Sequence, residues 1–140
     1  MASKGGFDAV QMRAVADAAD VALGTLYRYF PSKIHLLVSA LAVQFDATEA
    51  ALGRRPIPGD TPAERVMHVL RSSSRNLQRE PQLTEALTRA FMFADNTVAT
   101  EIDVVGMQLT AMLTRAMKGA DYVAGEPPSD EAIAIARVIS

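Results

Sequence analysis

Apolar residues recur every three or four positions along most of the chain, which is the spacing of one helix face. The longest apolar stripe predicts a helix over residues 32–52, a rod of about 30 Å at 1.5 Å per residue; it comprises Ile34, Leu37, Leu41, Phe45, Thr48 and Leu52. Similar stripes predict helices over residues 62–79, 81–94, 97–118 and from 129 onward. No segment alternates apolar and polar residues as a strand does, so the pattern predicts an all-α fold.

Residues with strong end-of-helix preferences stand at the edges of these stripes. Ser32 follows a proline and is suited to cap the long helix, and residues 61–64, Thr-Pro-Ala-Glu, form a capping box with proline at the first helical position. One of residues 95–97 is expected to cap the next helix, and Gly119 to end it. Ser129, followed by two acidic residues, is the expected N-cap of the last helix.

Residues 11–33 are the most informative stretch, because they predict two short helices joined by a tight bend at residues 20–21. This is the pattern of a helix-turn-helix, with Val21 expected as the apolar plug between the helices. The second helix is expected over residues 22–29. The apolar face of the first helix comprises Met12, Val15, Ala16 and Ala19, and that of the second comprises Leu23, Leu26 and Phe30.

The outward side of the second helix carries groups suited to nucleic acid. Hydroxyl and guanidinium groups donate to phosphate oxygens and base edges, and a glycine lets the backbone approach closely. A lysine in the first turn of the following helix can add to a phosphate site there. The candidate DNA-binding residues are Arg13, Gly24, Thr25, Tyr27, Arg28, Tyr29 and Lys33. The alternative is an ordinary surface hairpin in an all-α protein.

The segment VALGTLYRYFPSK resembles the signature of the TetR family of bacterial transcription regulators. The resemblance lies in residues 24–27, the aromatic pair Tyr29-Phe30 and the Ser32-Lys33 opening of the next helix. Within the family, the stretch is most similar to actinobacterial repressors of sterol (cholesterol) catabolism. Ala22, Leu23 and Asp20 depart from the usual family residues, so the operator sequence cannot be transferred.

The resemblance implies a ligand-responsive transcriptional repressor with two modules. A helix-turn-helix head at residues 1–45 would bind double-stranded operator DNA, and a body at residues 46–140 would bind a small apolar effector. The complete protein would be a homodimer. The effector would be a coenzyme A thioester of a sterol-derived acid, and its binding would rotate the long helix and release the heads from the DNA.

Such an effector requires an apolar tunnel, and pliable methionine side chains suit one. The candidate ligand-binding residues are Phe45, Met67, Leu70, Phe91, Met92, Leu109, Met112 and Leu113. A cationic mouth is available in Arg65, Arg71, Arg75 and Arg79. The alternatives are an ordinary solid core and a solvated helix face.

The two ends of the chain depart from the family pattern. A full helix is expected before Phe7, but MASKG stands there and is not expected to form it. We therefore expect Met12, Val15 and Leu26 to lose part of their cover. The helices used for dimerisation in the family are expected to be incomplete, so both ends are interpreted as truncated.

Composition excludes most other classes of function. The chain has no cysteine, and its two histidines, expected at or near the surface, have no ligand partners at metal-site spacing. No nucleophile elbow, paired carboxylates or phosphate loop is present, so we expect no catalytic site, metal or cofactor. Residues 1–33 carry four basic and three acidic side chains against a net charge of −2 overall.

The expected location is the cytoplasm. The first residues lack the apolar core of a signal peptide, and the apolar run at residues 34–43 is too short to span a bilayer. Two alternatives to a repressor remain: a helical effector-binding or scaffolding protein that does not bind DNA, and a small-molecule enzyme.

Overall fold

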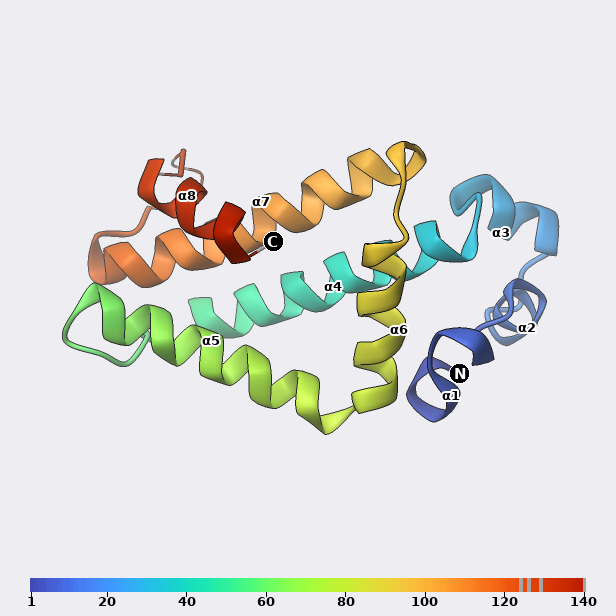
Figure 1. The fold of residues 1–140 in the computed structure, drawn as a ribbon, viewed down its shortest axis with the longest axis horizontal. Helices are drawn as coiled ribbons and strands as arrows, with labels where there is room; N and C mark the ends of the chain where they lie inside the picture. The colour runs from blue at the N-terminus through green and yellow to red at the C-terminus, as the bar shows by residue number, and fades with distance from the viewer. Residues whose placement is uncertain (124, 126, 129, 140) are drawn as a thin grey trace.

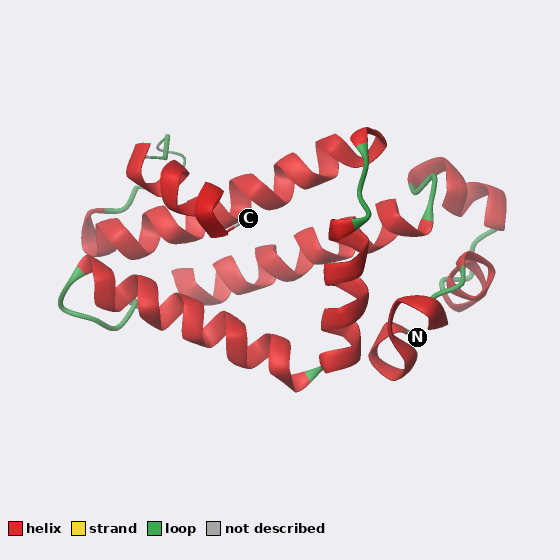
Figure 2. Cartoon of the chain, in the orientation of Figure 1, coloured by secondary structure: helices red, strands yellow, loops and turns green. Residues whose placement is uncertain are grey.

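The computed structural model describes residues 1–123, 125, 127–128 and 130–139, and all regular structure in these residues is helical. The all-α prediction is therefore confirmed (Figure 2). The elements are α1 (Ala2–Ala9), α2 (Met12–Ala18), α3 (Leu23–Tyr29), α4 (Lys33–Gly53), α5 (Pro62–Arg79), α6 (Pro81–Met92), α7 (Ala99–Lys118) and α8 (Asp130–Ile139), with short 3₁₀ turns η1 (Asn96–Val98) and η2 (Gly119–Asp121).

The helices form a small head and a larger body that share one long helix (Figure 1). Helices α4, α5 and α7 lie along the long axis of the molecule, and α6 crosses them. Helices α2 and α3 lie at the end where α4 begins, while α8 packs on α7. Helix α4 thus runs from the helix-turn-helix into the body, as the sequence predicts.

Helix α4 contributes apolar side chains to three core clusters. In the head, Leu36 packs against a cluster of Met12, Ala16 and Leu26. In the middle, Leu37 and Val38 are buried with residues of α6 and α7. Near the far end, Leu52 packs against the cluster of Val69, Met112 and Ala116. Burial of one large aliphatic side chain contributes about 1.5–3 kcal/mol to the free energy of folding. Because α4 contributes such side chains to clusters in the head and in the body, it joins the two modules into one packed unit.

The predicted helix ends are largely confirmed. Ser32 caps α4 by accepting a hydrogen bond from the His35 amide, and the capping box of Thr61 and Glu64 is formed in both directions. The Asp95 carboxylate accepts from the Thr97 amide at the start of η1. Gly119, at φ +57°, follows the last residue of α7. The predicted Ser129 cap lies outside the described residues.

The expectation that the first residues form no helix is wrong. Ala2–Ala9 is helical, with a break at Gly6 (φ 66°, ψ −155°), and it packs mainly against α6. Met12 and Leu26 are buried. They keep their cover because Leu23, Phe30 and Leu36 pack against them from α3 and α4.

The expectation that Val21 plugs the bend is also wrong, because its side chain is 40% exposed. Asp20 adopts a left-handed conformation (φ 54°) at the bend, and Ala16 is almost fully buried there. Ala16 and Leu26 therefore already fill the angle between α2 and α3, and Val21 faces solvent.

Helix α4 is the one described helix that is long and apolar enough to cross a membrane by length and composition, with a mean hydropathy of 1.3. In the structure it packs against α6 and α7. The side-chain amide of Gln108 in α7 donates hydrogen bonds to the Asp46 carboxylate and to the Ala42 carbonyl of α4. Of the apolar window of α4, 11% is buried in these contacts with the rest of the structure.

Candidate DNA-binding face and effector cavity

Helix α3 packs against α2 through one side, and its other side is exposed. Leu26 is buried against Met12 and Ala16, which fixes the helix on α2. Five predicted DNA-binding residues of α3 are exposed on its remaining surface: Gly24, Thr25, Tyr27, Arg28 and Tyr29. Arg13 of α2 is exposed as well. Tyr29 is 72% exposed and Tyr27 is 44% exposed. Within the described part of the chain, no hydrogen bond or ion pair occupies the polar groups of this face, so they are available to an external partner.

Gly24 has no packing role inside the chain. A Cβ atom built at Gly24 would meet no atom within 4 Å, and the residue is not in the left-handed region. A requirement for glycine at this position would therefore come from a molecule that approaches α3 from outside.

Lys33 is placed differently from the other predicted DNA-binding residues. It is half-buried, and its Nζ donates a hydrogen bond of 2.9 Å to the carbonyl oxygen of Phe7. The same ammonium lies 4.0 Å from the centroid of the Phe7 ring. Lys33 thus contacts Phe7 in the last turn of α1, and its predicted role at a phosphate stays a prediction.

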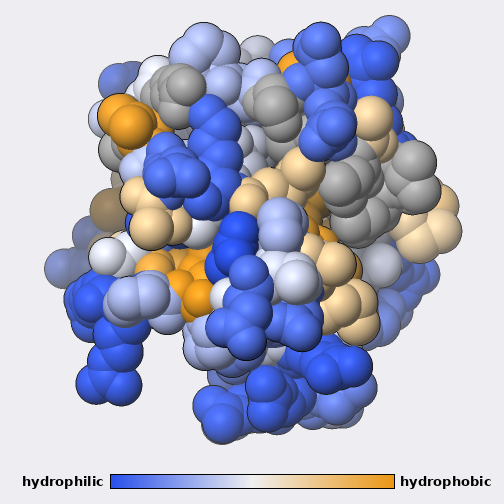
Figure 3. All heavy atoms as spheres, turned by 90° about the vertical axis from the view of Figure 1, so that its left-hand side faces the viewer, coloured by the Kyte–Doolittle hydropathy of each residue, from blue (hydrophilic) through white to orange (hydrophobic). Residues whose placement is uncertain are grey.

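The body contains a cavity of about 1520 Å³ between α4, α5, α6 and α7, with α8 at one side. Its apolar lining includes Leu41, Phe45, Leu70, Leu83, Leu87, Phe91, Ile102, Leu109, Met112 and Leu113. Apolar side chains gather in the middle of the end face formed by α5, α7 and α8, with hydrophilic residues around them (Figure 3). The cavity therefore suits a bulky, mainly apolar ligand.

Seven of the eight predicted ligand-binding residues line this cavity: Phe45, Leu70, Phe91, Met92, Leu109, Met112 and Leu113. Met67 does not, because it is 45% exposed on the opposite side of α5 and lines a shallow groove there. Leu77 of α5 is 44% exposed. It borders the cavity, which leaves part of its side chain uncovered.

The predicted cationic mouth is only partly present. Arg65 donates to the carbonyls of Ala116 and Met117 at 2.6 and 2.7 Å, so it caps the end of α7. Arg71 and Arg75 line the outer groove, and Arg79 is the member of the predicted set that reaches the cavity.

Several lining residues were missed from the sequence. Leucines such as Leu83 and Leu87 also line the cavity, and both lie within the predicted helix over residues 81–94. Arg137 of α8 also lines the cavity. Its spacing of four from Ile133, which borders the cavity too, could have placed it on that face.

His35 joins the head end of α4 to the segment between α6 and α7, contrary to the expected surface position. Its side chain is buried, with Nε2 3.0 Å from the Thr97 carbonyl oxygen and Nδ1 2.8 Å from the Ser32 hydroxyl. Because a carbonyl only accepts, Nε2 donates to the Thr97 carbonyl. Nearby, hydrogen bonds from the Thr97 hydroxyl and amide lower the pKa of the Asp95 carboxyl. No cluster of three metal-ligating side chains occurs among the described residues.

The described residues therefore combine a helix-turn-helix whose second helix is open with a body that contains an apolar cavity, and the long helix α4 joins the two. Residues 1–40 match the family described as bacterial regulatory proteins, tetR family. Residues 59–140 match the tetracyclin repressor-like C-terminal domain. The chain belongs to the TetR family, which confirms the resemblance seen in the sequence.

Curated relatives are similar along the whole chain. It is 54% identical over 140 residues to the HTH-type transcriptional repressor KstR of Rhodococcus jostii (strain RHA1), covering 62% of that protein. It is 54% identical to KstR of Mycolicibacterium smegmatis and 53% identical to KstR of Mycobacterium tuberculosis, covering 66% and 61% of them. The chain thus spans a little under two thirds of the length of these relatives.

A solved structure shares the fold. The crystal structure of a TetR transcriptional regulator from Rhodococcus sp. RHA1 superimposes with a TM-score of 0.84 at 30% sequence identity. The match covers 99% of this chain and 70% of that one.

Proposed function

We propose that the chain is part of a transcriptional repressor that binds operator DNA through α3 and is released by a bulky apolar effector in the body. The observation that carries this proposal is the state of α3. Its inner residue Leu26 is buried, while its hydroxyl and guanidinium groups are exposed and have no hydrogen-bond or ion-pair partner among the residues that the structure describes. The relatives that match along the whole chain are named as transcriptional repressors.

On the DNA side, α3 would enter the major groove. Thr25, Tyr27 and Arg28 would reach base edges and phosphates, and Gly24 would allow the backbone to approach closely. Arg13, Tyr29 and Lys33 would contact the flanking phosphates. In a homodimer, the two heads would bind half-sites about one turn of the DNA helix apart. The protein would act in the cytoplasm.

On the effector side, the cavity would hold a coenzyme A thioester of a sterol-derived acid. Drug-sized ligands occupy cavities of about 300–1,000 Å³, so a cavity of about 1520 Å³ has room for a larger molecule. The residues that would contact the apolar part are Phe45, Leu70, Phe91, Met92, Leu109, Met112 and Leu113. The head is assigned to residues 1–45 and the body to residues 46–140.

The effector would act by differential binding. A ligand that fits the body better in the DNA-free arrangement shifts the population toward it, and the shift is limited by the difference in affinity. Regulation of sterol and lipid catabolism would follow from the chemistry of this effector. A repressor of this kind needs no catalytic residue, metal or cofactor, and the proposal assigns none.

A pair of arginine variants tests the DNA-binding face. Arg28 on α3 and Arg71 on α5 are both exposed, so Arg28→Gln and Arg71→Gln remove the same charge from different surfaces. Affinity for a fluorescent DNA duplex is measured by anisotropy. Arg28→Gln is expected to cost about 1–3 kcal/mol, whereas Arg71→Gln should stay within about twofold of the unmodified chain. Equal losses for both variants would contradict the assignment of α3.

A further inference from the structure

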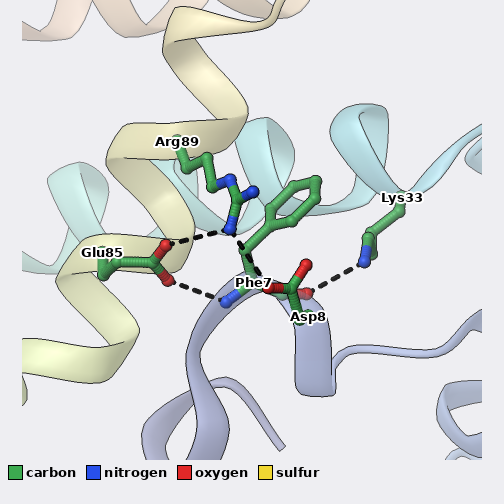
Figure 4. Close-up of polar contacts among 5 residues, drawn as sticks. All are labelled: Phe7, Asp8, Lys33, Glu85 and Arg89. Carbon is green, nitrogen blue, oxygen red and sulfur yellow. Dashed lines mark hydrogen bonds and ion pairs between the residues drawn. The ribbon is translucent and has the colours of Figure 1, made fainter.

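Phe7 lies where α1, α4 and α6 meet, and groups from α4 and α6 contact its backbone and its ring (Figure 4). Its amide donates a hydrogen bond of 2.9 Å to Oε2 of Glu85, and its carbonyl accepts one of 2.9 Å from Nζ of Lys33. The ring lies between Lys33 Nζ, 4.0 Å from the ring centroid, and the Arg89 guanidinium carbon, 5.1 Å from it. Phe7, Asp8, Lys33, Glu85 and Arg89 are called the Phe7 clamp below.

The two α6 residues of the Phe7 clamp act together. Nη1 of Arg89 lies 3.2 Å from Oδ2 of Asp8 and 3.4 Å from Oε1 of Glu85, so the guanidinium links α6 to α1. The two oxygens of Glu85 are divided between Arg89 and the Phe7 amide. At Gly6, a Cβ atom would overlap the Glu85 carboxylate, and φ is +66° there. Glycine at this position therefore lets the carboxylate approach the turn closely.

Helix α6 has a second face that forms part of the cavity wall. Leu83, Leu87 and Phe91 line the cavity, whereas Glu85 and Arg89 hold Phe7 and Asp8 in the last turn of α1. These residues interleave within about two and a half turns of one helix, so a shift or rotation of α6 caused by a ligand moves both faces together. The last turn of α1 leads through the buried Val10 into α2.

We propose that the Phe7 clamp transmits occupancy of the cavity to the DNA-binding head. Glu85 and Arg89 are positioning residues that set the place of the last turn of α1, and Lys33 ties the start of α4 to that turn. A displacement of α6 would therefore move α2 and change the environment of Lys33 at the same time. This inference rests on the proposed function, because it assigns a route between its two sites.

The alternative is that the Phe7 clamp only holds the head in place. Both ion pairs are exposed, with the Asp8 side chain at 80%, and exposed pairs contribute little to global stability. Variants of Glu85 and Arg89 are therefore expected to fold, which allows transmission to be measured apart from folding.

The test follows hydrogen exchange of the amides at residues 11–29 by mass spectrometry in the full chain. The cavity is occupied in two ways: by the coenzyme A thioester of a sterol side-chain acid, and by Leu109→Trp, which fills the cavity from α7. Each is applied to the unmodified chain and to the double variant Glu85→Leu with Arg89→Leu. The matched control is Glu49→Gln, which removes the ion pair between Glu49 and Arg115, whose atoms lie 3.8 Å apart in the body.

The expected result is that filling the cavity changes exchange at residues 11–29 in the unmodified chain and in Glu49→Gln. In the double variant this response falls at least fivefold, while the thioester still raises the melting temperature. A response of equal size in the double variant, or no response in the unmodified chain by either route, would overturn the inference. A missing thermal shift with the thioester contradicts the proposed effector class instead, and the Leu109→Trp arm still decides the role of the Phe7 clamp.

Discussion

Two tryptophan substitutions in the cavity wall are predicted to behave in opposite ways, although both replace apolar residues on predicted inward stripes. Met112 lines the cavity but is only 1% exposed, because it packs into a cluster with Val69 and Ala116. Phe91 also lines the cavity and is only partly buried. A larger side chain at Phe91 therefore has space to enter, and one at Met112 has none.

The magnitudes follow from packing. Met112→Trp adds several atoms to a closely packed cluster, and overpacking of this kind costs about 1–3 kcal/mol. For a chain of 140 residues, a loss of 1 kcal/mol lowers the melting temperature by about 3–5 °C. We therefore expect a decrease of about 3–15 °C for Met112→Trp. Phe91→Trp should cost less than about 1 kcal/mol, since the added ring occupies existing space in the cavity.

The assay is thermal unfolding with and without the coenzyme A thioester of a sterol side-chain acid. A ligand that binds only the folded state stabilises it by about 2.7 kcal/mol at a hundredfold excess over Kd. The unmodified chain should show this rise, and Phe91→Trp should lose it while keeping its own stability. Equal destabilisation by the two substitutions, with no response to ligand in the unmodified chain, would refute the proposed ligand-binding cavity. The body would then be a solid core.

Three further predictions concern single contacts. Lys33→Ala is expected to lower the dependence of DNA affinity on salt by about one unit of log–log slope; an unchanged slope in the anisotropy titration would limit Lys33 to its contact with Phe7. Thr61→Ala removes the capping box of α5 and should cost about 0.5–2 kcal/mol in urea unfolding; a loss below that range would show that this cap is dispensable. The hydrogen bonds from Thr97 lower the pKa of the Asp95 carboxyl in the folded state below its ordinary value of 3.8. These bonds therefore stabilise the fold at pH values above 3.8, and the stabilisation is lost as the pH falls through the pKa of the folded state. The stability difference between the unmodified chain and Asp95→Ala should therefore shrink in acid, and a constant difference from pH 7 to 3 would contradict this.

The parts of the fold that sequence predicted well depend on local signals. The apolar stripe of α4, the Ser32 cap and the capping box at Thr61 are each encoded within a few residues, and the structure contains all three. The outward face of α3 was likewise predicted, because Leu26 fixes which side of a short helix is buried.

The parts that were missed depend on contacts between distant segments. Helix α1 contains two glycines and has weak helical propensity, yet α6 holds it: Glu85 accepts from the Phe7 amide, and Glu80 accepts from the Ser3 hydroxyl at 2.8 Å. The contact between Lys33 and Phe7 joins residues 26 positions apart. The sequence did not place Met67 on the exposed side of α5, because a helical-wheel projection does not show which side of that helix faces the cavity.

The central claim is that a ligand in the body cavity weakens the hold of α3 on DNA. The most direct measurement is an anisotropy titration of the chain on a DNA duplex that the chain itself selects from a random pool, with and without the sterol-acid coenzyme A thioester. Binding of the thioester is checked in parallel by thermal shift. We expect saturating thioester to lower DNA affinity at least tenfold, equivalent to about 1.4 kcal/mol of coupling. Unchanged DNA affinity in the presence of bound thioester would contradict this claim.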